Sequence, residues 1–79
     1  MRRPRMLTTR ESLAHVQGLL TDVRFFLALA RAAGRSADSV RADVEGMLRD
    51  APLGGVDWRI QKAYRANVRR ELDSYTGGK

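Results

Sequence analysis

Five basic side chains near the carboxyl end of the chain recur at a spacing suited to binding phosphate. On a helix, at 100° per residue, their positions fall within an arc of about 140°, interrupted only by Asp73. They are Arg59, Lys62, Arg65, Arg69 and Arg70. Neutralisation of phosphates by Arg and Lys is a main source of affinity for nucleic acids. The spacing therefore predicts contacts with a phosphate backbone, and a solvated helix surface is the alternative.

The charge of the whole chain also favours an anionic partner. Its 79 residues include 15 Lys and Arg against 9 Asp and Glu, which gives a formal net charge of +6 and a pI of about 11.1. Such a surface attracts nucleic acids and acidic proteins through its long-range field. Most of the basic residues are Arg, which suits bidentate contact with phosphate, although a GC-rich genome would encode the same bias without any role in binding.

The amino-terminal segment carries its own group of arginines. Arg2, Arg3 and Arg5 surround Pro4, and this charge around a helix-hostile proline predicts a flexible basic arm over residues 1–7. The arm would add contacts in a groove of the nucleic acid. We expect residues 8–76 to form a single helical domain and residues 77–79 a disordered tail.

The sequence offers little for catalysis. His15 is the single imidazole, and the serines have no histidine within predictable reach to act as a base. The carboxylates of the middle segment are spread around a helix and predict neither an acid–base pair nor a metal site. They are Asp38, Asp43, Glu45 and Asp50. From these residues we expect no enzyme and no cofactor, and the single histidine and the lack of cysteine lead us to expect no metal.

The first element expected is a long helix. Thr8 and Glu11 form a capping-box pattern, so the helix should start at Thr9 and run to about Ala33, where Gly34 can adopt the left-handed cap. Its apolar positions at helical spacing predict one buried stripe. The stripe comprises Leu13, Val16, Leu19, Leu20, Val23, Phe26, Leu27 and Ala30.

Two shorter helices should follow. Ser36 predicts a cap for a helix from Ala37 to about Asp50. Pro52 and two glycines form the next connection, and Asp57 can cap a third helix. The expected apolar positions are Val40, Val44, Met47, Leu48 and Ala51 in the second helix and Ile60, Tyr64, Val68, Leu72 and Tyr75 in the third.

The pattern as a whole predicts an all-α protein, a small three-helix bundle with an αα-corner at Gly34. No segment alternates with the period of a strand. For Trp58 and Tyr64 we favour packing, with Trp58 closing the end of the bundle, over stacking on unpaired bases.

The stretch at 27–48, LALARAAGRSADSVRADVEGML, contains two apolar helical patterns separated by a Gly-Arg-Ser turn. Ser36 would cap the second helix and Val40 would anchor it on the first. The stretch resembles the helix-turn-helix of DeoR-type winged repressors, which implies DNA reading by the second helix. By that resemblance the residues nearest the bases are Arg35, Ala37, Asp38, Ser39 and Arg41. An ordinary αα-corner, capped by Gly34, is the alternative.

Phe25 and Leu29 fall outside the buried stripe of the first helix. Either a bent terminus or the loop around Pro52 folds over them, or they form a subunit or partner interface. A chain this small, without disulfides or metal, commonly gains stability by self-association, so we expect a homodimer.

These features favour a small, basic, helical nucleic-acid-binding protein, with DNA and RNA both open. The alternative is a protein–protein adaptor or inhibitor, of the kind mobile elements encode, that acts through Phe25 and Leu29 on an acidic partner. No apolar run reaches the length of about 18 residues that a membrane span needs, and the charged start is not followed by a signal-type apolar segment. We therefore expect a cytoplasmic protein without a membrane partner.

Overall fold

The computed structural model describes residues 6–75, which form three helices and no strand. They are α1 (Thr9–Ala32), α2 (Ala37–Asp50) and α3 (Trp58–Asp73). The predicted all-α three-helix bundle is confirmed, and the helix bounds agree with the sequence patterns to within a residue or two. Most of the predicted basic arm, including Arg2, Arg3 and Arg5, lies outside the described residues, as does the tail at 77–79.

The helices begin where the capping residues predict. The hydroxyl of Thr8 accepts a hydrogen bond from the Glu11 backbone (3.1 Å), and the Glu11 carboxylate accepts one from the Thr8 backbone (2.9 Å). The side chains of Ser36 and Asp57 cap α2 and α3 by accepting hydrogen bonds from the backbones of Ser39 and Arg59. Gly34 has a φ of 70°, a conformation that L side chains rarely adopt, and it ends the first helix.

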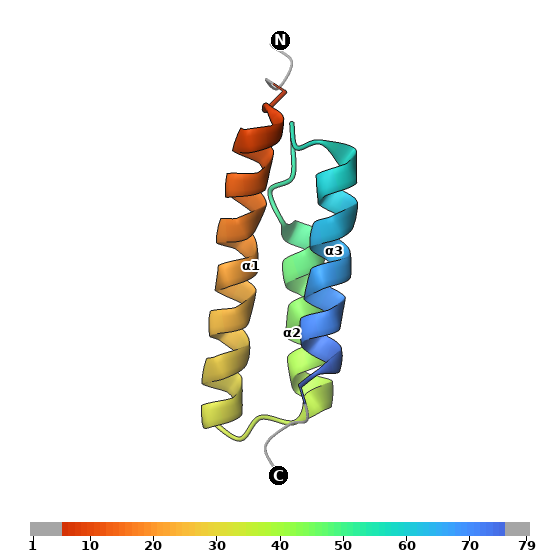
Figure 1. Cartoon of the computed structure of the whole chain (residues 1–79). Helices are drawn as coiled ribbons and strands as arrows, with labels where there is room; N and C mark the ends of the chain where they lie inside the picture. The colour runs from red at the N-terminus through yellow and green to blue at the C-terminus, as the bar shows by residue number, and fades with distance from the viewer. Residues whose placement is uncertain (1–5, 76–79) are drawn as a thin grey trace.

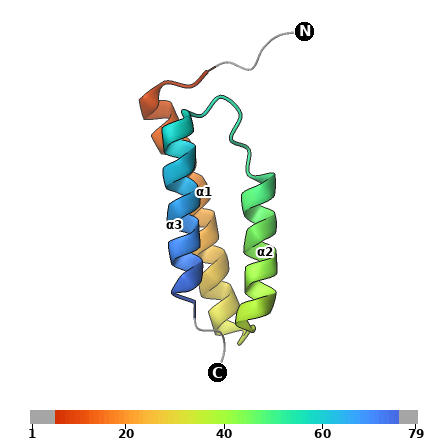
Figure 2. The same cartoon turned by 90° about the vertical axis from the view of Figure 1, so that its right-hand side faces the viewer.

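The chain reverses direction at Gly34, so that α1 and α2 lie antiparallel and side by side (Figure 1). This arrangement is an αα-hairpin, not the corner with a sharp angle that we expected. Each of the two helices has an apolar stripe that runs from one end to the other. The two stripes can bury each other over their full length only if the helix axes are nearly aligned. α3 runs antiparallel to α2, and the three helices pack around a common core (Figure 2).

The core contains most of the predicted apolar positions. Val23, Val40, Val44 and Val68 are completely buried. The remaining buried apolar side chains are Val16, Leu27, Ala30, Leu48, Leu53, Val56, Tyr64, Leu72 and Tyr75, and Leu19, Leu20, Phe26, Met47, Ala51 and Ile60 pack partly buried against them.

Two predicted packing positions are wrong. Leu13 is 46% exposed, because it lies on the side of α1 that faces α3 and lines an open cleft between these two helices. Trp58 is 68% exposed and does not close the bundle. It precedes Arg65 by seven residues, two helical turns, and therefore lies on the same outward side of α3.

The connection between α2 and α3, residues 51–57, is tied to the start of α1. The backbone N–H of Leu7 donates to the carbonyl of Gly55 (2.8 Å), and that of Asp57 donates to the buried hydroxyl of Ser12 (3.3 Å). The His15 imidazole is hydrogen-bonded to the carbonyl of Pro52 (2.7 Å). The connection thus lies at the opposite end of α1 from Phe25 and Leu29, and the hypothesis that it covers them is wrong.

By length and composition alone, α1 could cross a membrane, since its most apolar 18-residue stretch has a mean hydropathy of 1.3. The core helix of a bundle meets the same criterion, and the buried residues of α1 do form part of the core. Only 22% of that apolar stretch is buried, however. Much of the apolar surface of α1 therefore faces outward.

We expect Leu72→Ala to lower the free energy of unfolding by about 2–5 kcal/mol, because Leu72 is 3% exposed and its loss leaves a cavity between the helices. The matched change Leu13→Ala should cost less than about 1 kcal/mol, since much of that side chain already contacts solvent. Urea denaturation followed by circular dichroism measures both. Equal losses would show that the two positions are equally buried in solution.

Candidate nucleic-acid interface

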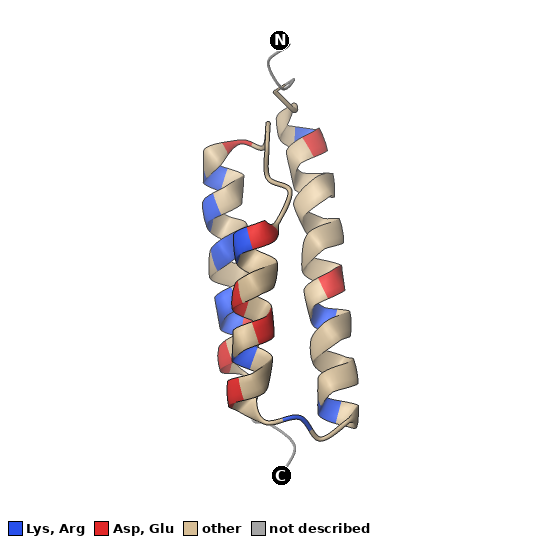
Figure 3. Cartoon of the chain, turned by 180° about the vertical axis from the view of Figure 1, so that it is seen from behind, with Lys and Arg blue, Asp and Glu red and all other residues tan. Residues whose placement is uncertain are grey.

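The basic side chains of α3 lie along one arc of the helix, and the two ends of this arc have different neighbours. Arg65 and Arg69 face α2, where they line a shallow hollow of about 270 Å³ together with Glu45, Leu48 and Arg49. Lys62 precedes Arg65 by three residues and Arg69 by seven, so it lies on the same side. We call Arg49, Lys62, Arg65 and Arg69 the α2–α3 basic cluster. Figure 3 shows basic positions following one another along α3, with acidic positions concentrated on α2.

The cations of this cluster are only loosely paired. Arg69 Nη1 lies 3.4 Å from Glu45 Oε1, and Arg49 Nε lies 3.8 Å from Asp50 Oδ1, both at the surface. Among the described residues, Lys62 and Arg65 have no ion pair. Exposed pairs of this kind are worth about 0–1 kcal/mol. A phosphate can therefore compete for all four cations at little cost.

Arg59 and Arg70 lie toward the other end of the arc, nearer to α1, and Lys62 lies between them and Arg65. Arg59 and Arg70 are eleven residues apart, three turns of helix, and so share one side of α3. The Arg59 guanidinium lies 5.6 Å from the centre of the Trp58 ring, and Arg70 donates a hydrogen bond to Asn67 (3.3 Å). The five cations that the sequence placed on one arc are thus divided, and three of them join the cluster.

The start of α3 adds to the positive potential. Its first turn contains Arg59 and no acidic residue, although the positive end of the helix dipole favours acidic side chains there by about 0.3–1 kcal/mol. Only the N-cap Asp57 offsets this, through a hydrogen bond from the Arg59 backbone (2.8 Å). An anion bound nearby would relieve the remaining unfavourable charge.

Arg35 and Arg41, which the helix-turn-helix resemblance singles out, each have an ion-pair partner. Arg35 is half-buried and donates to the Asp43 carboxylate (2.6 Å), and its carbonyl accepts a hydrogen bond from Tyr75 (2.7 Å). Arg41 Nη2 lies 3.7 Å from Asp73 Oδ1 of α3. These contacts fasten the α1–α2 turn and the α2–α3 packing.

Much of the net charge lies beyond the described residues. Residues 6–75 contain eleven Arg and Lys against nine Asp and Glu, a net charge of +2 out of +6 for the chain. Arg2, Arg3 and Arg5 of the predicted arm contribute three of the other four charges. Within the described part, positive charge is therefore a local property of the cluster and not a general property of the surface.

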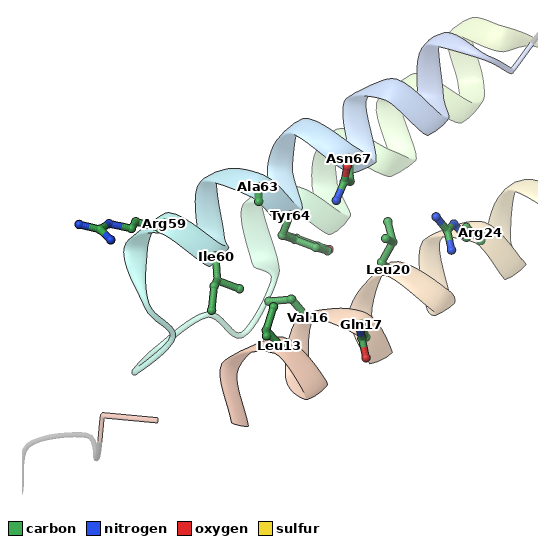
Figure 4. Close-up of a pocket in the computed structure, with 10 residues that line it drawn as sticks. All are labelled: Leu13, Val16, Gln17, Leu20, Arg24, Arg59, Ile60, Ala63, Tyr64 and Asn67. Atoms are coloured by element: carbon green, nitrogen blue, oxygen red, sulfur yellow. The ribbon is translucent and has the colours of Figure 1, made fainter. Parts of the chain in front are cut away.

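A second concave surface, between α1 and α3, is mainly apolar (Figure 4). This cleft has a volume of about 410 Å³. Its lining residues are Leu13, Val16, Gln17, Leu20, Arg24, Arg59, Ile60, Ala63, Tyr64 and Asn67. Arg24 is held by Glu71 across the two helices (3.3 Å). The cleft lies on the side of α3 away from Arg65 and Arg69, so it does not extend the basic cluster.

Comparisons of the chain with protein-family models, with curated proteins and with solved structures give no match. The surface chemistry is therefore the basis for a function. Sequence patterns had indicated Lys62, Arg65 and Arg69, but not Arg49. Arg49 lies four residues after Glu45, in the last turn of α2. This position could indicate a role in the cluster only if the packing of α3 beside that turn were known.

Tyr64 provides a test of the packing beside this site. Burial raises the pKa of the Tyr64 phenol above its ordinary value of 10.0, Asp22 raises it further, and Arg65 lowers it. The folded state thus prefers the neutral phenol, so the free energy of unfolding should fall as the pH rises from about 10 through the folded-state pKa. Tyr64→Phe should remove this contribution to the decrease in the free energy of unfolding at alkaline pH.

Urea denaturation at neutral and alkaline pH measures this effect. Tyr75→Phe is the control, because it deletes a hydrogen bond to Arg35 and should cost about 1 kcal/mol already at neutral pH. If Tyr64→Phe leaves the decrease in the free energy of unfolding at alkaline pH unchanged, the Tyr64 side chain is exposed in solution.

Proposed function

We propose that this chain binds nucleic acid through the α2–α3 basic cluster. The observation that supports it is the placement of Lys62 and Arg65, without ion pairs among the described residues, beside the weakly paired Arg49 and Arg69. Nine acidic side chains are available in the chain, yet only Glu45 contributes to this hollow. Such a local excess of exposed guanidinium and ammonium groups attracts a polyanion.

The spacing of the cations favours a polymer over a single small anion. Lys62, Arg65 and Arg69 follow one another at roughly one per turn of helix, about 5.4 Å apart along the axis. A chain of phosphates laid along α3 can contact several of them at once, and each contact releases counterions. Arg2, Arg3 and Arg5 of the amino-terminal arm would add contacts of the same kind.

Trp58 extends this stripe with an aromatic ring. Trp58, Lys62, Arg65 and Arg69 are spaced by four, three and four residues, which places all four on one side of α3. The ring is 68% exposed and available to a ligand. An exposed aromatic side chain next to phosphate-binding cations is the arrangement that binds unpaired bases by stacking. We therefore propose single-stranded nucleic acid as the preferred form.

The variant K62Q/R65Q/R69Q should lower affinity for a single-stranded oligonucleotide at least about tenfold at 0.1 M salt, because it removes three phosphate contacts. The slope of log K against log salt should become shallower by about 2, at roughly 0.7 per contact. Fluorescence anisotropy over a series of salt concentrations measures both quantities.

The variant R10Q/R31Q/R70Q is the matched control, since it removes the same charge from positions outside the cluster and away from Trp58. Its affinity should stay within about threefold of the native chain. Equal losses in the two variants would show that only total charge matters, and binding that ignores salt would exclude phosphate recognition altogether.

Trp58→Ala should weaken binding of single strands by about 1–3 kcal/mol and leave duplex binding nearly unchanged, because only unpaired bases can stack on the ring. The control is Leu13→Ala, which shortens another exposed apolar side chain at a position of α1 outside the cluster. Parallel titrations of single-stranded and duplex oligonucleotides measure the difference. Equal effects of Trp58→Ala on both forms would contradict a stacking role.

A further inference from the structure

The side of α1 that faces away from the core has no charged residue at its centre. We call this surface the outer face of α1, and it consists of Ala14, Gly18, Thr21, Phe25, Ala28, Leu29 and Ala32, all of them exposed. Phe25 is 64% and Leu29 55% exposed. Figure 3 shows the contrast between the long uncharged stretches of α1 and the closely spaced charges of α2 and α3. An apolar helix face of this kind marks an interaction surface.

Gly18 has no evident role in a single chain. It lies in the middle of α1, where glycine is less favourable than alanine because it loses more backbone freedom on folding. Its φ is not in the left-handed region, and a Cβ built on it would meet nothing within 4 Å. The lack of a side chain at Gly18 is useful only if another molecule packs closely against this position.

The outer face is complementary to itself. Phe25 and Leu29 are four residues apart, as are Ala14 and Gly18, and at 100° per residue all four lie within an arc of about 60°. If a second α1 packs antiparallel, with a two-fold axis between residues 21 and 22, Phe25 lies opposite Gly18 of the other copy. In the same register Leu29 lies opposite Ala14. Both large side chains thus meet the two smallest ones, as in the packing of knobs into holes.

The charges that such a pairing brings together are few. Two copies that each have a net charge of +6 repel one another, so a stable dimer needs a contact surface with little charge. The centre of the outer face meets this requirement, while Asp22 lies at its edge beside the two-fold axis and Arg10 lies in the first turn of the helix. Figure 1 shows that α1 forms one side of the molecule while α2 and α3 lie together on the other, so nothing in the described fold obstructs this face.

We propose that the chain forms a two-fold symmetric dimer by antiparallel pairing of the outer faces of α1. The pairing excludes Phe25 and Leu29 from solvent and gives Gly18 a function. It leaves the α2–α3 basic cluster on the outside of both copies. The dimer does not depend on nucleic-acid binding and can be tested without it.

Phe25→Ser and Gly18→Leu should each raise the dimer dissociation constant at least about tenfold, the first by removing the large side chain and the second by filling its recess. Trp58→Ser and Ala66→Leu are the controls, because they make similar changes at exposed positions of α3. Sedimentation equilibrium of the full chain measures association. Circular dichroism checks that each variant keeps its helices.

The register has its own test, since the native chain has no cysteine. Thr21→Cys lies next to the proposed axis and should form a disulfide-linked dimer under mild oxidation. Ala14→Cys should not, because its two copies would be separated by about 22 Å along the helix axes. The double variant G18L/F25A exchanges the large and small positions and should recover association that Gly18→Leu alone loses.

Salt separates this proposal from the proposed function. Dimerisation should strengthen as salt rises, because salt screens the repulsion between like-charged copies, whereas nucleic-acid binding should weaken. A chain that stays monomeric at about 100 μM would overturn the dimer, as would crosslinking through Ala14→Cys. Phe25-dependent binding of the monomer to vesicles of anionic lipid would overturn it in favour of a membrane surface.

Discussion

The burial of one face of α1 against both other helices is the interaction on which the rest of the structure depends. Val23 of α1 is completely buried, as are Val40 and Val44 of α2 and Val68 of α3. A chain of 79 residues can bury only one stripe of each helix. The opposite side of each helix is therefore left to solvent or to partners, and the three helices use it differently. α2 and α3 expose charges, and α1 exposes apolar and small residues.

Local signals predicted the fold well because they act within a few residues. The capping box of Thr8 and Glu11, the Ser36 cap and the left-handed Gly34 each determine a helix end through contacts within one turn. The buried stripes followed from helical periodicity alone. These features needed no knowledge of how the helices are placed relative to one another.

The predictions that failed depended on the neighbours of each helix. Leu13 belongs to the apolar stripe, but it lines an open cleft between α1 and α3 that leaves it partly exposed. Trp58 is apolar, yet it follows the cap directly and lies on the outward side of α3. The five basic residues of α3 do lie on one arc of the helix, as helical periodicity predicted. The division of this arc into a cluster beside α2 and a pair at the end nearer to α1 appears only when the positions of the other helices are known, and the same knowledge is needed to add Arg49.

The two proposed surfaces lie on different helices, and this has a thermodynamic consequence. A nucleic acid on α3 and a second copy on α1 do not compete for the same residues, so both can be bound at once. Phosphates that neutralise Lys62, Arg65 and Arg69 also reduce the charge with which one copy repels the other. Each binding event then favours the other by the same free energy. Two clusters on one dimer can also engage the same strand, where the second contact forms at a high effective concentration if the strand is long enough to reach it. A small basic chain with weak individual contacts would thereby bind long nucleic acids more tightly than short ones.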